Sequence, residues 1–113
     1  MTTCSTHVLD AARGLPAAGI EVTLATVDGA TLATATTDDD GRIRWDEPLR
    51  TAGLDADLTP SAYRLSFATG DWFAAEDRDT FFPRVELTVA LAGPHAHVAL
   101  LLSPFAYTTY RGS

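Results

Sequence analysis

The stretch GIEVTLATVDGATLATATT, residues 19–37, decides the fold class of this chain. Its apolar residues Ile20, Val22 and Leu24 alternate with polar ones, and a period of two is typical of a half-buried β-strand. The dipeptide Asp28-Gly29 follows, which is a strong indication of a tight hairpin turn. The stretch therefore predicts two neighbouring antiparallel strands, one at about residues 19–27 and the other at residues 31–37.

After this hairpin the chain continues in short segments of the same kind, separated by turn residues. Asp46 to Pro60 is predicted to be a loop with pieces of local structure, and Asp71 to Arg78 is the only convincing helix. Roughly eight short strands with one small helix indicate an all-β fold, an antiparallel sandwich. The later strands are expected around residues 42–45, 63–67, 85–91, 95–103 and 105–110.

A chain of 113 residues has the length of one domain, so we expect residues 1–113 to share a single hydrophobic core. Hydrophobic residues make up 46% of the sequence, a fraction that argues against a disordered chain. Cys4 is the only cysteine, so no intrachain disulfide can form and the chain suits a reducing compartment. The first residues lack the basic and apolar segments of a signal peptide, and we expect a cytoplasmic protein.

The charge and the apolar runs limit the partners. The formal net charge is −7, and no cluster of Lys or Arg interrupts it, so we expect no nucleic-acid partner. The longest apolar run, Val98 to Leu102, is far too short to span a membrane. This run does not alternate, so both faces of its strand are expected to be covered. In a small sandwich only another subunit can cover the outer face, which points to an oligomer.

Histidine titrates near neutral pH and can shuttle protons, so a hydrolase without a metal would use it. The sequence contains three, His7, His95 and His97. His95 and His97 lie two residues apart on a predicted strand and therefore on one face of it. A lone strand histidine is more often structural, so the pattern by itself leaves the three roles open.

Two further features are candidates for ligand binding. Arg42 follows Asp40-Gly41 where a turn leads into a strand, and its planar fork of donors suits a flat, oxygen-rich or anionic ligand. An arginine beside acidic residues is more often simply solvated. The C-terminal Tyr110-Arg111-Gly112-Ser113 combines an aromatic ring, a guanidinium and a flexible glycine directly after a predicted strand. Chain ends are usually frayed, so the pattern alone does not decide whether this segment binds a ligand.

Several motifs together resemble one family, the 5-hydroxyisourate hydrolases, which are the enzymatic branch of the transthyretin-like proteins. The resemblance runs from about Cys4 to Ser113, in the expected order and spacing. The C-terminal tetrapeptide is its most specific part, because the hormone-carrying transthyretins lack it. The sequence departs from the family pattern at few positions: Ala99 stands where the family usually has proline, and Thr108 where serine is common. The motifs that carry the resemblance are Ser5–Asp10, Gly14–Ala17, Asp40–Arg42, Phe81–Pro83 and His97–Ser113.

The resemblance implies a transthyretin-like antiparallel β-sandwich of two four-stranded sheets with one short helix, assembled as a homotetramer. It implies active sites in the channel between dimers, and no cofactor or metal. His7, Arg42 and His97 match the family's catalytic residues. The residues expected to bind substrate are the same three together with Tyr110, Arg111, Gly112 and Ser113.

The implied reaction opens the ring of 5-hydroxyisourate to 2-oxo-4-hydroxy-4-carboxy-5-ureidoimidazoline in urate degradation. His7 and His97 would share the removal of a proton from water and the donation of one to the departing nitrogen. Arg42 would bind the oxygen-rich edge of the substrate and stabilise developing negative charge. Which histidine is the base stays open at this point.

Three other functions fit parts of the sequence. A metallohydrolase could use His7, His95 and His97 as three ligands, the usual count for catalytic zinc. That hypothesis leaves Arg42 and the C-terminus without a role. The chain could instead be a ligand carrier of the transthyretin type. A Cys4 nucleophile is the third alternative, although its chain neighbours supply no positive charge to lower the pKa of the thiol.

Overall fold

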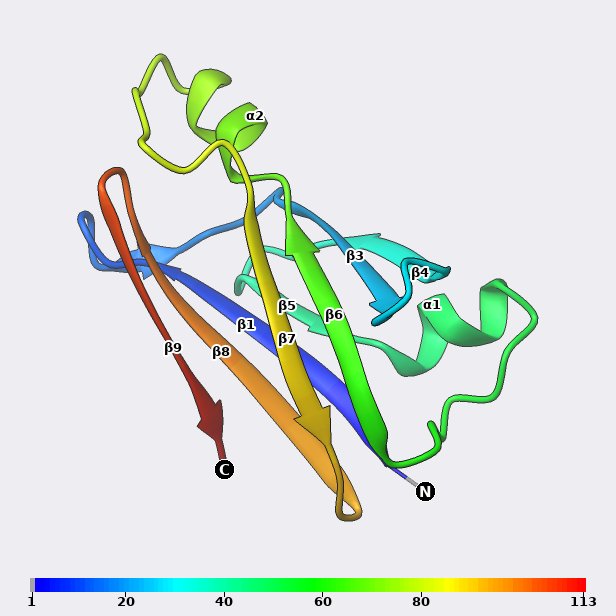
Figure 1. Cartoon of the computed structure of the whole chain (residues 1–113). Helices are drawn as coiled ribbons and strands as arrows, with labels where there is room; N and C mark the ends of the chain where they lie inside the picture. The colour runs from blue at the N-terminus through cyan, green and yellow to red at the C-terminus, as the bar shows by residue number, and fades with distance from the viewer. Residues whose placement is uncertain (1) are drawn as a thin grey trace.

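The computed structural model describes residues 2–113, which fold into two β-sheets packed face to face with two short helices (Figure 1). The strands are β1 (Thr3–Asp10), β2 (Leu15–Pro16), β3 (Glu21–Thr26), β4 (Thr31–Thr36), β5 (Arg42–Arg44), β6 (Ser61–Phe67), β7 (Val85–Leu91), β8 (His95–Ser103) and β9 (Ala106–Gly112). The helices are α1 (Asp46–Thr51) and α2 (Thr69–Ala74). Within the described residues, neither helix is long and apolar enough to cross a membrane.

The predicted sandwich of sheets is confirmed, but its strand pairing differs from the expectation. One sheet has four strands, in the order β4-β3-β6-β7, and all its pairs are antiparallel. The other has five, in the order β2-β1-β8-β9 with β5 also paired to β1. In this sheet β1 and β8 are parallel, from the pair Thr3↔His95 to the pair Asp10↔Leu102. A parallel pair needs a long crossover, and here the chain passes through the whole opposite sheet between β1 and β8.

Strand β1 was not predicted, because polar residues occupy its buried face and hide the alternation. Thr6 and Asp10 both face the core, and they are 0% and 2% exposed. Each is satisfied: the indole Nε1–H of Trp45 donates to the Thr6 hydroxyl at 2.9 Å, and the Arg78 guanidinium donates to the Asp10 carboxylate at 2.8 Å. Burial alone would raise the pKa of Asp10, but Arg78 and two backbone N–H groups outweigh it and lower the pKa.

The helices also differ from the sequence expectation of one helix at 71–78. Helix α1 lies inside the predicted loop and buries Leu49 against the core. Helix α2 begins at Thr69, two residues early, because Thr69 and Gly70 are tied to the chain ahead of β7. The Thr69 hydroxyl donates to the Phe82 carbonyl at 2.6 Å, and the Gly70 N–H donates to the Pro83 carbonyl at 2.9 Å. A Cβ at position 70 would lie 2.8 Å from that carbonyl, so the close approach requires glycine.

The core lies between the two sheets, and β8 shows how it is separated from the outer face. Its residues Ala96, Val98, Leu100 and Leu102 are buried and point toward the opposite sheet. The alternate positions, beginning with His95, lie on the outer face of the five-stranded sheet. The side chains of strand β1 alternate in the same way between the core and the outer face. The outer face of this sheet therefore carries the three histidines and Arg42, which the sequence marked as candidates.

Candidate active site

Strand β1 brings three distant residues together on the outer face of the five-stranded sheet. It pairs with β5 in the register His7↔Arg42, and with β8 in the register Ser5↔His97. Residues opposite one another in neighbouring strands share a face, so all four side chains lie on one side of the sheet. The imidazole rings of His7 and His97 are 6.3 Å apart between centroids, tilted by 44°. The two imidazoles are therefore neighbours on this face.

The turn before β5 holds both His7 and Arg42. The Asp38 carboxylate accepts hydrogen bonds from the N–H groups of Asp40 and Arg42, both at 2.9 Å. Gly41 has φ +75°, and a Cβ there would collide with the Val8 carbonyl, so this turn requires glycine. The Asp40 carbonyl lies 3.0 Å from His7 Nε2. Because a carbonyl only accepts, this hydrogen bond requires a proton on His7 Nε2, and Nδ1 is the acceptor when the imidazole is neutral.

His97, like His7, is half buried, and its ring is held on two sides. Its Nδ1 lies 2.7 Å from the Ser5 hydroxyl. Burial lowers the pKa of His97, and the positive charge of Arg42, then His7 and His95, lowers it further. Gly112 lies against the other edge of the ring, where a Cβ would overlap the imidazole. His97 is therefore a neutral imidazole in a fixed orientation near neutral pH.

A pocket of about 190 Å³ opens beside these residues, lined from β1, β5 and β8. Both arginines of β5, Arg42 and Arg44, line it. Among residues 2–113, no carboxylate lies within ion-pair distance of either guanidinium. A chain of net charge −7 thus presents two exposed arginines and its histidines on one face, which favours an anionic or oxygen-rich ligand.

Sequence reasoning missed two residues of this face. Arg44 lies two positions after Arg42 on the same strand, so the period of two would have placed it on the same side. Ser5 belongs to the opening motif, and only the register of β1 against β8 shows that its hydroxyl reaches His97.

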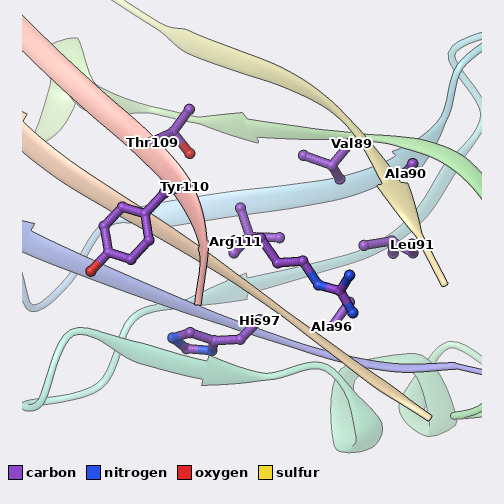
Figure 2. Close-up of a pocket in the computed structure, with 9 residues that line it drawn as sticks. Val89, Ala90, Leu91, Ala96, His97, Thr109, Tyr110 and Arg111 are labelled. Carbon is purple, nitrogen blue, oxygen red and sulfur yellow. The ribbon is translucent and has the colours of Figure 1, made fainter. Parts of the chain in front are cut away.

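The C-terminal segment divides between two sides of the sheet. In β9, Tyr110 pairs with Ala99 and Gly112 pairs with His97, so both lie toward the outer face. Arg111 pairs with Val98 and points to the inner side, away from Tyr110 (Figure 2). There it lines a second pocket of about 220 Å³ with side chains of β7 and β8. Ser113 is exposed, and within the described chain no hydrogen bond or ion pair joins it to His7, Arg42 or His97.

The geometry also bears on two of the alternatives. Across the part of the chain that the structure describes, no three His, Cys, Asp or Glu side chains are grouped as a metal site would need. His7, His95 and His97 are therefore not arranged as a three-ligand set. Cys4 is 1% exposed, and burial, with the nearby Asp46, raises the pKa of its thiol to about 12. A thiolate nucleophile is not available from such a residue near neutral pH.

Comparisons with known proteins show which sequences and folds this chain resembles. The 5-hydroxyisourate hydrolase of Salmonella dublin is 44% identical over 114 residues, which cover 96% of this chain and 79% of that protein. The structure of Klebsiella pneumoniae 5-hydroxyisourate hydrolase superimposes with a TM-score of 0.87 and 37% identity, covering 100% of both chains. Sea bream transthyretin in complex with thyroxine superimposes with a TM-score of 0.79 and 29% identity, covering 96% of this chain and 93% of that one. A model of the HIUase/transthyretin family matches residues 4–112, and the chain belongs to this family.

Proposed function

We propose that this chain is a 5-hydroxyisourate hydrolase of urate degradation, which opens the substrate ring to 2-oxo-4-hydroxy-4-carboxy-5-ureidoimidazoline. The observation that carries the proposal is the gathering of His7, Arg42 and His97 on one exposed sheet face, in a chain whose relatives carry this name. The substrate is a small, flat, oxidised purine with several carbonyl groups. The face offers two proton-transfer groups and a planar cation for such a molecule.

His97 is the residue that we assign to removal of the proton from water. Its pKa is lowered by burial and by Arg42, so at neutral pH its imidazole is unprotonated and can accept a proton. Its Nδ1 is engaged by Ser5, which leaves Nε2 to meet the water. His7 is assigned to orienting the departing ring nitrogen, because its Nδ1, which the Asp40 contact leaves free, can accept a hydrogen bond from that N–H. No covalent intermediate with the protein is required.

Arg42 is assigned to the attacked carbonyl. Negative charge develops on that oxygen as water adds, and a guanidinium in place before the reaction stabilises it without reorganisation. The exposed position and the missing ion pair leave the fork of Arg42 available for this oxygen, within the residues that the structure describes. Two imidazoles and a guanidinium supply the proton transfer and the charge stabilisation, so the proposed mechanism uses neither a metal nor another cofactor.

The rest of the site is proposed to come from the C-terminal segment and from assembly. Tyr110 and Gly112 lie toward the same face as His97 and would border the substrate. Arg111 and Ser113 remain predicted binding residues, although the single chain turns Arg111 away. We further propose one domain over residues 1–113, a homotetramer whose dimers meet over this face, and a cytoplasmic location in keeping with the single buried cysteine.

A carrier of the transthyretin type is the second candidate, because the sea bream protein of similar fold was solved with thyroxine. Two measurements on the same preparation separate the candidates. Freshly made 5-hydroxyisourate should lose its absorbance faster with the protein than in buffer alone, since this substrate also decays unaided. Thyroxine should not bind in equilibrium dialysis at matched concentration. Tight thyroxine binding together with a buffer-like decay would support the carrier instead.

A further inference from the structure

Four polar side chains form a continuous row of hydrogen bonds beside the proposed site. Strand β1 contributes Thr3 and Ser5, and the parallel strand β8 contributes His95 and His97, in the registers Thr3↔His95 and Ser5↔His97. Thr3 Oγ1 lies 2.6 Å from His95 Nδ1, and His95 Nε2 lies 2.8 Å from Ser5 Oγ. The same Ser5 Oγ lies 2.7 Å from His97 Nδ1. The mechanism above uses only the Ser5–His97 end of this row.

The single proton of the Ser5 hydroxyl allows two arrangements of the row. A serine donates one hydrogen bond and accepts up to two, so it can donate to only one of the two imidazoles. In one arrangement His97 Nδ1–H donates to Ser5 and Ser5 donates to His95, which leaves the Nε2 of His97 free to accept a proton. In the other, His95 donates to Ser5 and Ser5 donates to His97, whose Nε2 then carries a proton to give away.

The surroundings of the two imidazoles decide where a positive charge can rest. His97 is half buried, and its ring neighbours that of His7 of β1. It lines one pocket with Arg42 and Arg44 of β5, and another with Tyr110 of β9. Burial opposes a proton on His97, and the nearby cations add to this effect, so its pKa is lowered. His95 is exposed to solvent, and water stabilises a charge there. A positive charge at the exposed position 95 is therefore better solvated than one at the half-buried position 97.

We propose that Ser5 and His95 are positioning residues that form a proton relay with His97, and that during hydrolysis the proton taken from water is held on His95. The proposal rests on the proposed function, because it extends the role given to His97.

The relay conserves protons at each member. Water gives a proton to His97 Nε2 as its oxygen bonds to the substrate carbonyl carbon. His97 Nδ1 passes its own proton to the Ser5 oxygen, and Ser5 passes its original proton to His95 Nε2. His95 becomes the imidazolium, with its Nδ1–H donated to Thr3 Oγ1. When the ring C–N bond breaks, the same transfers run in reverse, and His97 Nε2 returns the proton to the departing nitrogen or to the water beside it.

The test compares hydroxyl variants at position 5. Ser5→Ala removes the relay and should lower kcat by roughly 10- to 100-fold, by analogy with loss of the groups that orient metal-bound histidines. Ser5→Thr keeps the hydroxyl and should retain most of the activity. Thr34→Ala is the matched control, because it removes an exposed hydroxyl that bridges two strands of the other sheet, at 3.3 Å from Thr23. The control should leave kcat unchanged.

A spectroscopic readout without substrate separates the relay from the proposed function. The ¹⁵N shifts of the histidine rings should show His97 Nδ1 responding to the titration of His95 in the wild type and in Ser5→Thr, but not in Ser5→Ala. His95→Gln, at an exposed position, provides a second variant and should lower kcat while preserving the fold. An unchanged His97 response or an unchanged kcat in Ser5→Ala would overturn the relay. Coupled shifts in a protein that does not hydrolyse 5-hydroxyisourate would instead overturn the proposed function.

Discussion

The electrostatic state of one imidazole, that of His97, governs what the candidate site can do. Burial is the largest cause that lowers its pKa, and Arg42 is the next. We therefore expect ¹⁵N-detected titration to give a midpoint for His97 below the usual histidine value of about 6.5. Arg42→Ala should raise this midpoint without restoring it fully, because the burial remains. A wild-type midpoint above the usual value would contradict the charge distribution described for this face.

The lowered pKa of His97 also makes the stability of the folded chain depend on pH. A histidine whose pKa is lower in the folded state binds protons more weakly there than in the unfolded chain. His97 therefore contributes stability that is present above the unfolded-state pKa and is lost as the pH falls through the window between that value and the lower folded one.

Arg42 is predicted to act through the shape of its side chain as well as its charge. Arg42→Lys keeps the charge but loses the planar fork, so its turnover of 5-hydroxyisourate should resemble that of Arg42→Ala more than that of the wild type. Steady-state kinetics of the three proteins at one pH decide this. Near-normal turnover of Arg42→Lys would mean that Arg42 contributes only its positive charge and not the geometry of its guanidinium.

At the scale of elements, the sequence predicted the strands whose buried faces are apolar. The hairpin over residues 19–37 was found as β3 and β4, and β6, β7 and β8 agree with their expected ranges within a few residues. Strand β1 was missed because Thr6 and Asp10 occupy core positions, satisfied by partners 39 and 68 residues away in the sequence. No local pattern reveals such partners.

The last strand, β9, is predicted to hold His97 in place through Gly112. A Cβ at position 112 would overlap the imidazole, so Gly112→Ala must displace the ring. Because misplacement of a catalytic group by about 1 Å can cost on the order of 100-fold in rate, a loss of about this size is expected. Circular dichroism and sedimentation should show an unchanged fold and assembly. Full activity in Gly112→Ala would show that the position of His97 relative to β9 does not matter.

At the scale of the molecule, the site itself could not be derived from spacing. His7, Arg42 and His97 were named through the resemblance of the motifs to a family, and their contact depends on β1 pairing with both β5 and β8. Ser5 and Arg44 were not named as site residues, since their place on this face follows from the same pairing. Strand pairing between distant segments is a property of the whole sandwich, so sequence patterns predicted the types of elements better than their neighbours.

The proposed assembly also has a test at this scale. The apolar run of β8 offers two candidate interface residues, Leu100 and Leu101, and the structure distinguishes them by their burial. Leu100 is 0% exposed in the core, so a charge there would unfold the chain, whereas Leu101 lies on the outer face and is half buried. Leu101→Asp should split the tetramer into dimers and remove activity, as seen by sedimentation and turnover at the same concentration. Fully active dimers would refute a site shared between dimers.

The central claim is that His7 and His97 on the outer sheet face hydrolyse 5-hydroxyisourate. The most direct measurement is the decay of freshly made substrate with increasing amounts of the wild type and of three alanine variants, after subtraction of the decay in buffer. The wild-type rate should rise in proportion to protein, and His7→Ala and His97→Ala should each lower kcat by roughly 10²–10⁴, the usual contribution of a general acid or base. His95→Ala should lose much less. A wild-type rate equal to that of buffer, or a larger loss in His95→Ala than in the other two, would contradict the account.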